Sequence, residues 1–326
     1  MAIYSVLLIV LGSSILVLTL FDLVKTTLVS SPYGGPLTAR VAQVVRFVFV
    51  RLLGNRRHAL VGPGVLLAVL LAWLFFSWFG WTLLFSAWEG AVVESQSGRP
   101  AGLTERIYFV GYSLFTLGIG DYRPRGAFWQ FATVLCAAQG FAVITLSFTY
   151  IVPIISAVTQ KRQLAVLISQ LGVRPEMIVT RAWNGHDFGW LEPQLMSLLP
   201  RLTELQLQHD TYPVLHYFND TERKQAVVLS LAALDDAVTL LSLAVREEVR
   251  PDANVLRSVR EAVGAYLETL EAVHIRATDL PPLPSLAKLR EAGIPVVAEN
   301  LFLERAKPLQ HRRQLLLALL EHDGWA

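Results

Sequence analysis

The sequence predicts an all-α membrane protein in which three membrane helices and a re-entrant segment precede a helical cytosolic domain. Hydrophobic residues make up 53% of the 326 residues and charged residues only 17%, which excludes a soluble protein throughout the chain. The charges are also divided unevenly. Residues 1–160 contain ten Lys and Arg against five Asp and Glu, whereas residues 161–326 contain eighteen against twenty-one.

Three uncharged runs are long enough to cross a hydrocarbon layer, which requires about 20 helical residues. They cover residues 2–21, 59–88 and 126–160. A cleaved signal peptide is the competing interpretation of the first run, but residues 1–6 contain no positive charge and no Ala-X-Ala site follows. The sequence therefore predicts three membrane helices.

The positive charges predict the orientation of these helices. Between Lys25 and the second run lie five arginines and no acidic residue: Arg40, Arg46, Arg51, Arg56 and Arg57. By the positive-inside rule this linker faces the cytoplasm, as do Lys161 and Arg162 after the third run. We therefore expect an extracytoplasmic N-terminus and a cytoplasmic C-terminal domain in a bacterial plasma (inner) membrane.

The end of the first helix and the linker carry further expectations. Asp22 and Lys25 are three residues apart and are expected to pair at the membrane interface. The apolar stretch 41–53 among the arginines is typical of an amphipathic helix on an anionic lipid leaflet, and a solvated loop is equally compatible with it. None of the runs contains the series of arginines that a voltage sensor needs.

The re-entrant segment follows from a Gly-X-Gly string between the second and third runs. It consists of Thr116, Leu117, Gly118, Ile119, Gly120 and Asp121. Non-helical backbone at membrane depth must be buried in protein or line a water-filled path. The segment meets this requirement if its carbonyl oxygens replace the water shell of a cation, which would make it an ion-selectivity filter. Residues 104–115 show helical apolar spacing, with Thr104 as the expected N-cap. The negative end of this helix would point at the filter and favour a cation.

This order of elements resembles the potassium-channel pore family, whose filter usually reads Thr-Val-Gly-Tyr-Gly-Asp. The resemblance covers about residues 61–158 and includes the exit through Tyr122 and Pro124. It implies that K⁺ is bound by the carbonyls of Thr116, Leu117, Gly118 and Ile119, with Asp121 at the outer mouth. Gly118 and Gly120 would permit left-handed backbone. One filter segment per chain then implies a cyclic homotetramer.

The third run would be the inner helix of such a pore. Gly140 lies 24 residues after Thr116, where inner helices of the family commonly carry a hinge glycine, and close helix packing is the alternative role. Pro153 should kink or loosen the helix near the inner mouth. The candidates for the cavity-lining stripe are Phe141, Ile144, Phe148 and Val152, with Phe148 as the candidate constriction. Contact with lipid is the other interpretation of this stripe.

The pore segment also departs from the family pattern. Ile119 stands where an aromatic residue is usual, and Phe115 replaces a common threonine. Tyr108 and Phe109 stand where the pore helix often carries tryptophan, so a hydrogen-bond donor to Asp121 has to come from Tyr108 or is absent. These changes leave a carbonyl ladder intact but could weaken the preference for potassium over sodium.

Four domains result: an N-terminal helix in 1–30, a basic linker in 31–58, a pore domain in 59–160 and a helical cytosolic domain in 161–326. Within the pore domain we expect an outer helix at 59–88, a pore helix at 104–115, a filter at 116–121 and an inner helix at 126–160. Helical periodicity in the last domain covers 191–207, 221–249, 254–273 and 310–320. This domain contains no Gly-X-Gly-X-X-Gly turn after a strand, so the sequence does not support a nucleotide-type regulatory domain.

The cytosolic half offers one cluster that invites a metal interpretation: His209, Asp210 and His216. Its spacing fits no familiar zinc or calcium pattern, and histidines at the surface and at helix ends are the better interpretation. Cys136, the only cysteine, lies in a hydrophobic run and is expected to be a packed thiol. No enzyme, resident cofactor or nucleic-acid partner is indicated.

The leading hypothesis is a potassium-selective homotetrameric channel that conducts passively and that its cytosolic domain assembles or gates. Two alternatives remain open. The first is a weakly selective cation channel, which Ile119 and Phe115 would favour. The second is a membrane-anchored sensor or interaction protein whose pore fold does not conduct.

Overall fold

The computed structural model describes residues 2–29, 34–53, 60–218, 220, 222–271, 279–322 and 324–325. The described chain is mainly helical and forms two compact units that divide within one long helix, between Ile154 and Ile155. The short segment Tyr212–Val214 groups with the first unit. Each unit has its own hydrophobic core.

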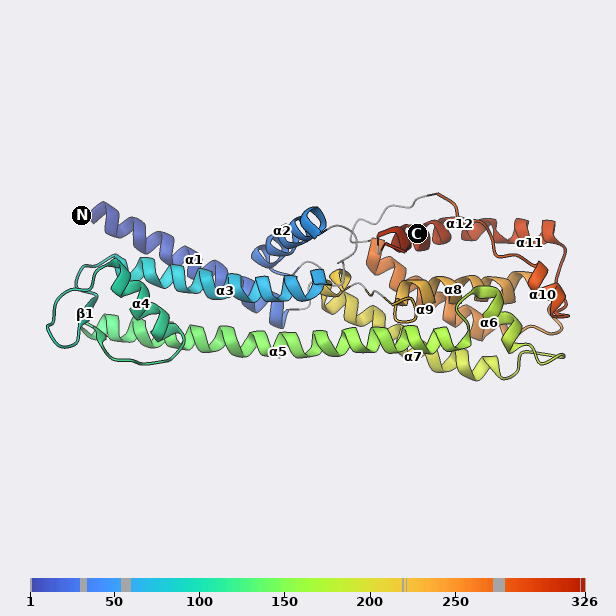
Figure 1. The fold of residues 1–326 in the computed structure, drawn as a ribbon, viewed down its shortest axis with the longest axis horizontal. Coiled ribbons are helices and arrows are strands. Elements are labelled where there is room, and N and C mark those ends of the chain that lie inside the picture. The colour runs from blue at the N-terminus through green and yellow to red at the C-terminus, as the bar shows by residue number, and fades with distance from the viewer. Residues whose placement is uncertain are drawn as a thin grey trace. The chain divides into compact units, whose positions relative to one another are not determined.

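The first unit contains the residues predicted to form a pore and is called the pore unit below, after that prediction. It is built from membrane-length helices and a small two-stranded sheet. Its elements are α1 (Ala2–Leu28), α2 (Pro36–Leu53), α3 (Val61–Ser86), β1 (Val92–Glu94), α4 (Leu103–Leu114), β2 (Tyr122–Pro124) and the first part of α5 (Ala127–Leu171) (Figure 1). The two strands are antiparallel, with Val92 opposite Pro124 and Glu94 opposite Tyr122. They join the chain before α4 to the chain after the Gly-X-Gly segment.

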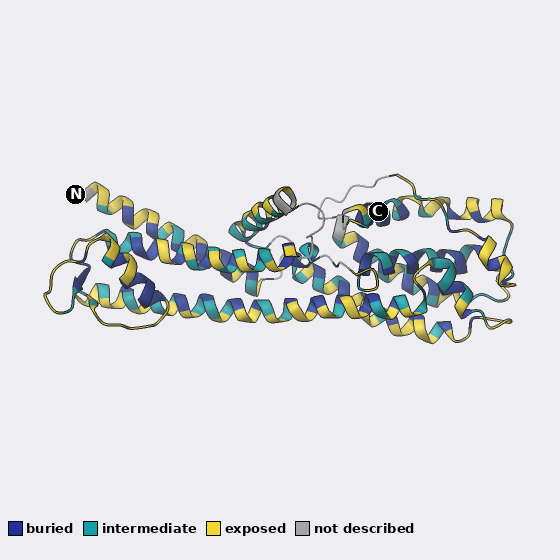
Figure 2. Ribbon diagram, viewed as in Figure 1, coloured by how far each residue is buried: buried dark blue, intermediate teal, exposed yellow. Residues whose placement is uncertain are grey.

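Four described helices are long and apolar enough to cross a membrane: Ile3–Leu28, Val61–Ser86, Ala127–Leu171 and Val227–Ala244. The first three coincide with the uncharged runs of the sequence. Between 28% and 33% of the apolar window of these three is buried in a single chain, against 72% for the fourth. Exposed positions accordingly repeat along α1, α3 and α5 (Figure 2). The fourth helix has the burial of a core helix, because protein of its own unit covers it.

Glycines allow α1 and α3 to approach closely. A Cβ atom on Gly12 would lie 2.9 Å from the carbonyl oxygen of Gly80, and one on Gly80 would lie 2.8 Å from the side chain of Leu16. Both distances are too short for a real Cβ atom. Small residues at helix crossings are the usual way in which membrane helices gain van der Waals contact, since lipid supplies little hydrophobic force between them.

An aromatic core joins α3, α4 and α5. The ring of Phe85 packs against those of Phe109 at 5.2 Å and Trp129 at 5.3 Å between centroids. Cys136 is fully buried in the same cluster as a free thiol, which confirms the expected packing role. Apolar contacts with α3 and α5 therefore hold helix α4 in place.

Several helix bounds differ from the sequence prediction. The pore helix begins at Leu103 with Gly102 as N-cap, not Thr104, and the side chain of Glu105 accepts the Gly102 N–H at 2.6 Å. The inner helix does not end at residue 160 but continues to Leu171, because its later apolar side chains enter the core of the second unit. Pro153 lies inside α5 without ending it.

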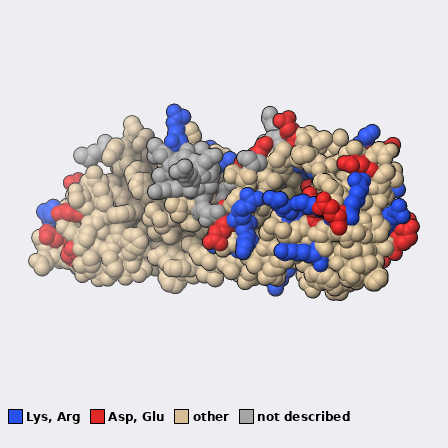
Figure 3. Space-filling model, turned by 45° about the vertical axis from the view of Figure 1, so that its right-hand side comes forward, with Lys and Arg blue, Asp and Glu red and all other residues tan. Residues whose placement is uncertain are grey.

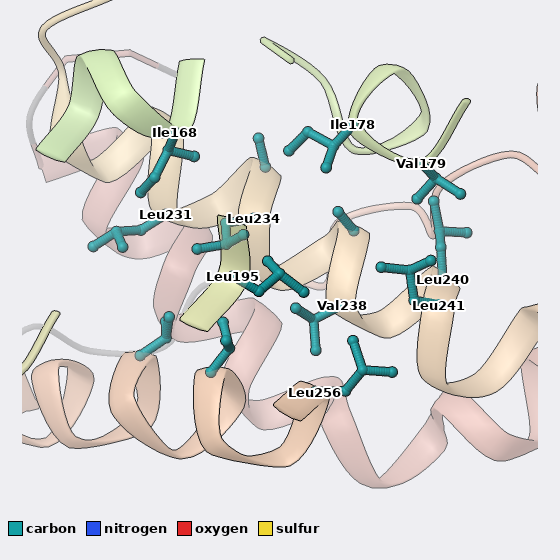
Figure 4. Packing of buried hydrophobic residues seen from close by; sticks show 14 of the residues in the cluster. Ile168, Ile178, Val179, Leu195, Leu231, Leu234, Val238, Leu240, Leu241 and Leu256 are labelled. Atoms are coloured by element: carbon teal, nitrogen blue, oxygen red, sulfur yellow. The ribbon is translucent and has the colours of Figure 1, made fainter. Parts of the chain in front are cut away.

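The second unit is a bundle of shorter helices. It contains α6 (Pro175–Ala182), α7 (Leu191–Thr211), the part of η2 (Pro213–Tyr217) that follows Val214, α8 (Val227–Thr239), η3 (Leu240–Ala244), α9 (Ala253–Glu271), α10 (Ala287–Glu291), α11 (Glu299–Ala306), η4 (Lys307–Leu309) and α12 (Gln310–His322). Buried side chains such as Ile168, Leu195 and Leu234 meet in its core (Figure 4). Residues of both charge signs lie close together over its visible surface (Figure 3).

The predicted helix at 221–249 is wrong at both ends. The observed helix α8 begins at Val227, and the π-helical turn η3 ends at Ala244. After this turn Val245 leaves the helix and forms an isolated antiparallel bridge with Val296. Apolar periodicity alone did not reveal this bridge, because its partner lies some fifty residues later in the chain.

Candidate functional site

The Gly-X-Gly segment is anchored on the last turn of the pore helix. The N–H of Thr116 donates to the Ser113 carbonyl at 3.1 Å, and the N–H of Leu117 donates to the Tyr112 carbonyl at 2.8 Å. These bonds satisfy two carbonyls that the end of a helix leaves free. They also place the segment directly at the negative end of the α4 dipole.

Every second residue of the segment has left-handed backbone. The φ angles of Thr116, Gly118 and Gly120 are +58°, +60° and +88°. Glycine adopts this conformation without strain, but a threonine there is an uncommon and costly choice. A strained residue at this position is typical of backbone that is shaped for a ligand.

The segment leaves four successive carbonyl oxygens without a hydrogen-bond donor in the described chain. They belong to Thr116, Leu117, Gly118 and Ile119. Residues 115–121 are all exposed in a single chain. Unpaired carbonyls are costly in a dry environment and are favourable where a cation replaces the missing donors. The arrangement can therefore coordinate a dehydrated cation.

The outer end of the segment differs from its middle. The Gly120 carbonyl accepts a hydrogen bond from Ser95 Oγ at 2.6 Å, and the Asp121 carbonyl accepts one from the Ser95 N–H at 2.8 Å. The Asp121 carboxylate accepts the N–H of Tyr122 at 3.1 Å. Tyr108 interacts with the same carboxylate, so the tyrosine that the sequence named as the candidate donor does lie near Asp121.

Ion pairs of Arg99 connect the loop after β1 to helix α4. Arg99 lies 2.6 Å from Glu105 and 3.7 Å from Glu94. The hydrogen bond from Arg99, together with the Gly102 N–H, lowers the pKa of Glu105 to about 2. The negative charges of Glu94 and Glu105 are thus both paired with Arg99.

Helix α5, the predicted inner helix, packs at Gly140 against the C-terminal end of α4, the predicted pore helix. A Cβ atom there would overlap the Leu114 carbonyl oxygen and lie 2.8 Å from the Leu114 carbonyl carbon. Its neighbour Gln139 accepts the indole N–H of Trp81 at 3.0 Å and donates to Ser77 Oγ at 3.1 Å. Gln139 was not predicted as a functional residue, although an amide inside an uncharged run is a signal that could have revealed it.

The expected gate residues lie along one exposed stripe of α5. Phe141, Phe148 and Val152 are 66%, 66% and 63% exposed in a single chain, whereas Ile144 is only partly exposed. Pro153, next to Val152, is also partly exposed. In an assembly this stripe has to face a central cavity, a neighbouring copy or lipid, because it is too apolar for water.

Asp22 forms a junction that the sequence did not reveal. Its buried carboxylate accepts the N–H of Leu37 at 2.7 Å, the hydroxyl of Thr38 at 2.6 Å and the indole N–H of Trp73 at 2.8 Å. The expected pair with Lys25 is not formed among the described residues. The first turn of α2 captures the carboxylate instead, since its free N–H groups and positive dipole attract an anion.

Helix α2 carries the predicted basic and apolar residues on its exposed face. Val44 and Phe47 are each 62% exposed, and Arg40, Arg46 and Arg51 are exposed beside them. The guanidinium of Arg51 lies 5.7 Å from the centre of the Phe47 ring. Arg56 and Arg57 lie outside the described residues.

The predicted surface position is wrong for His209, whereas Asp210 is exposed and His216 is partly exposed. His209 is only 3% exposed, and its ring contacts those of His216 and Tyr266 at 5.1 and 5.0 Å. Among the described residues no group of three or more His, Cys, Asp and Glu side chains is placed to hold a metal ion. The nearby Lys161 donates to the Phe218 carbonyl at 2.7 Å.

Comparison with known proteins points to one family. Residues 68–157 match the family model described as "Ion channel". Over 316 aligned residues the chain is 33% identical to the uncharacterised membrane protein YdjJ of Bacillus subtilis (strain 168). The aligned region covers 96% of this chain and 93% of that protein. No solved structure matches. The matched segment contains α4, the Gly-X-Gly segment and the part of α5 that precedes Val158.

Proposed function

Because the chain belongs to the ion channel family, we propose that four copies form a channel that conducts potassium passively through residues 116–121. The observation that carries the proposal is the row of four carbonyl oxygens, Thr116 to Ile119, that have no donor in the described chain. Stacked carbonyl rings of this kind replace the water shell of a potassium ion.

The fourfold assembly follows from the number of filter segments. Each chain supplies one, and a ring of carbonyls around an axis needs several copies. The exposed filter and the exposed apolar stripe of α5 are surfaces that such an assembly would cover. The candidate gate residues near the inner mouth would then be Phe148, Val152 and Pro153. Gly140 would lie where the inner helix α5 contacts the pore helix α4.

Selectivity for potassium is the finer part of the proposal. Ile119 has no ring to pack behind the filter and is 54% exposed, and Phe115 is 39% exposed. A weakly selective cation channel is therefore the alternative that these residues favour. The Thr116 hydroxyl and the four carbonyls contain the oxygen ligands that potassium requires.

The proposed setting is a bacterial plasma membrane, with three spanning helices per subunit, the N-terminus outside and the second unit in the cytoplasm. The excess of arginine in and after α2 supports this orientation. Anionic lipid is the proposed partner of Arg40, Arg46 and Arg51, because their exposed helix face also presents Val44 and Phe47. The same proposal extends to Arg56 and Arg57.

The proposed role of the second unit is assembly or gating. Helix α5 passes from the pore unit into the second unit without interruption, so it offers a covalent link between them. Removal of residues after 171 should change opening or tetramer formation. Unchanged currents and unchanged tetramers in the shortened protein would contradict this role.

Flux measurements test the channel itself. The purified protein is reconstituted in liposomes, and potassium and sodium fluxes are compared for wild type, Gly118→Ala and Gly293→Ala. Both glycines have positive φ, +60° and +73°, and open space around the Cβ position, but only Gly118 lies in the proposed filter. We expect selective flux in wild type and Gly293→Ala and none in Gly118→Ala.

Two results would contradict the proposal. Equal potassium and sodium flux in wild type would favour the weakly selective channel. A folded wild-type tetramer without flux at any applied voltage would favour a non-conducting sensor or interaction protein.

A further inference from the structure

One residue outside the filter occupies both carbonyls that follow the free row. The Gly120 carbonyl accepts the Ser95 hydroxyl at 2.6 Å, and the Asp121 carbonyl accepts the Ser95 N–H at 2.8 Å. The four preceding carbonyls, those of residues 116–119, accept no hydrogen bond within the described ranges. The change from free to occupied carbonyls therefore occurs at Gly120, and Ser95 causes it.

Ser95 is itself held firmly. It follows β1, whose Glu94 pairs with Tyr122 of β2, so its bond to Asp121 continues the antiparallel ladder by one residue. The loop after it is closed by hydrogen bonds between Glu94 and the backbone of Gly98 and Arg99. Arg99 then binds Glu105 on the pore helix. The residue that donates to Gly120 thus lies in a loop that is bound to both β2 and α4.

Among the described residues, no hydrogen bond supports the middle of the proposed filter. The inner anchor is the bond from the Leu117 N–H to the Tyr112 carbonyl, at 2.8 Å. From Gly118 to Ile119 neither N–H nor carbonyl groups form a hydrogen bond in the part of the chain that the structure describes. Ile119 has no polar side-chain atom to supply one. The segment is suspended between an inner anchor at Leu117 and an outer anchor at Ser95.

We infer that Ser95 is a positioning residue of the filter, whose hydroxyl fixes the Gly120 carbonyl and sets Ile119 as the outer end of the ion-binding row. This inference rests on the proposed channel function. The spacing of oxygen ligands decides which cation replaces its water shell at the lowest cost, and free rotation of the last peptide would change that spacing. Ser95 would act through Gly120 and would not touch the ion.

The test compares Ser95→Ala, Ser95→Thr and Ser97→Ala in liposomes with potassium and sodium gradients. Ser97 is the matched control, since it lies in the same loop but its hydroxyl donates to the Glu94 carboxylate at 2.6 Å. We expect Ser95→Ala to lower the ratio of potassium to sodium permeability by at least about five-fold, the factor that one hydrogen bond is worth at equilibrium. Ser95→Thr keeps the hydroxyl and should retain the ratio, as should Ser97→Ala.

The outcomes separate the inference from the proposed function. Absence of wild-type flux overturns the channel proposal and the inference with it. A selective wild type whose ratio is unchanged in Ser95→Ala overturns the inference alone, and so does a ratio that falls equally in Ser97→Ala. If Ser95→Ala does not form tetramers, Ser95→Cys replaces it, because the thiol has a similar shape and is a weaker donor. An unchanged permeability ratio in Ser95→Cys would likewise overturn the inference.

Discussion

The backbone of Gly140 on the inner helix lies directly against the carbonyl of Leu114 at the end of the pore helix. A Cβ atom on Gly140 would overlap that oxygen and lie 2.8 Å from its carbon. Leu114 is fully buried and immediately precedes the residues that anchor the filter. The glycine is therefore required for close packing, which was one of the two roles that its position in the sequence suggested.

Gly140→Ala should destabilise the pore unit by about 1–3 kcal/mol or more, because the added methyl group forces two backbones apart. Thermal unfolding of the purified protein measures the change. Gly90→Ala is the control, since a Cβ atom there would meet only the Trp88 side chain at 3.6 Å. Equal unfolding temperatures for Gly140→Ala and wild type would mean that the two helices do not pack as described.

Asp22 should be essential for the start of α2. Asp22→Ala leaves the N–H groups of Leu37, Thr38 and Trp73 without their acceptor, at a cost of about 1–3 kcal/mol for each buried donor. Hydrogen exchange along residues 36–42 should become faster, because the N-terminal turn of α2 loses its cap.

Trp73→Phe provides a graded comparison for Asp22→Ala. It removes only the 2.8 Å bond from the indole and leaves the helix cap in place, so α2 should stay protected from exchange. Unchanged exchange in Asp22→Ala would show that the carboxylate does not cap this helix. Faster exchange at 36–42 in Trp73→Phe would contradict the expectation that the cap holds without the indole bond.

The membrane elements could be predicted because their signals are local. Lipid requires long uncharged runs, and the Gly-X-Gly segment has left-handed backbone at Gly118 and Gly120, which glycine adopts most readily. Even there, the N-cap at Gly102 was missed, because Thr104 is a preferred capping residue in sequence and the capping contact comes from Glu105.

The remaining errors concern side chains whose partners are distant in sequence. Asp22 meets Trp73 across fifty-one positions, so a nearby lysine appeared to be the better partner. His209 seemed exposed near the end of a polar helix, but η2 and α9 cover it with His216 and Tyr266. Ser95 had no signal at all, because a serine in a polar loop is the ordinary case.

The ion pair between Arg312 and Asp235 should be critical for the second unit. Two nitrogens of Arg312 lie 2.7 and 2.9 Å from Asp235 Oδ1, and Asp235 is 1% exposed. Arg312→Met would remove the hydrogen-bonded ion-pair partner of this buried carboxylate and leave only the more distant charge of Arg260, at a cost of up to about 3–5 kcal/mol. Chemical unfolding of the purified protein measures this loss.

Arg201→Met is the control for this prediction. Arg201 pairs with Glu204 at 3.6 Å, with both side chains well exposed, and an exposed pair contributes at most about 1 kcal/mol. Similar losses in both variants would contradict the burial of the Arg312 pair. A large loss in Arg312→Met alone would also support α8 as a core helix, because Asp235 lies within it.

Mild acid should destabilise the second unit through His209. Burial lowers the pKa of His209 well below its usual range, and the positive charges of His216 and Lys161 add to this shift. Its Nδ1 lies 2.8 Å from the Leu205 carbonyl, and the ring of Tyr266 covers another side. The folded protein therefore keeps this imidazole neutral, whereas the unfolded chain binds a proton near pH 6.5.

The sign of the pH effect follows from this difference in proton binding. Above about pH 6.5 neither state is protonated at His209, and the contribution to stability is complete. As the pH falls further, only the unfolded state takes up the proton, so the free energy of unfolding decreases by up to about 1.4 kcal/mol per pH unit. Thermal unfolding at pH 7.5 and 5.5 should show this loss in wild type and in His186→Gln, whose side chain is exposed, and a smaller loss in His209→Gln. An equal loss in His209→Gln would assign the acid sensitivity to other groups.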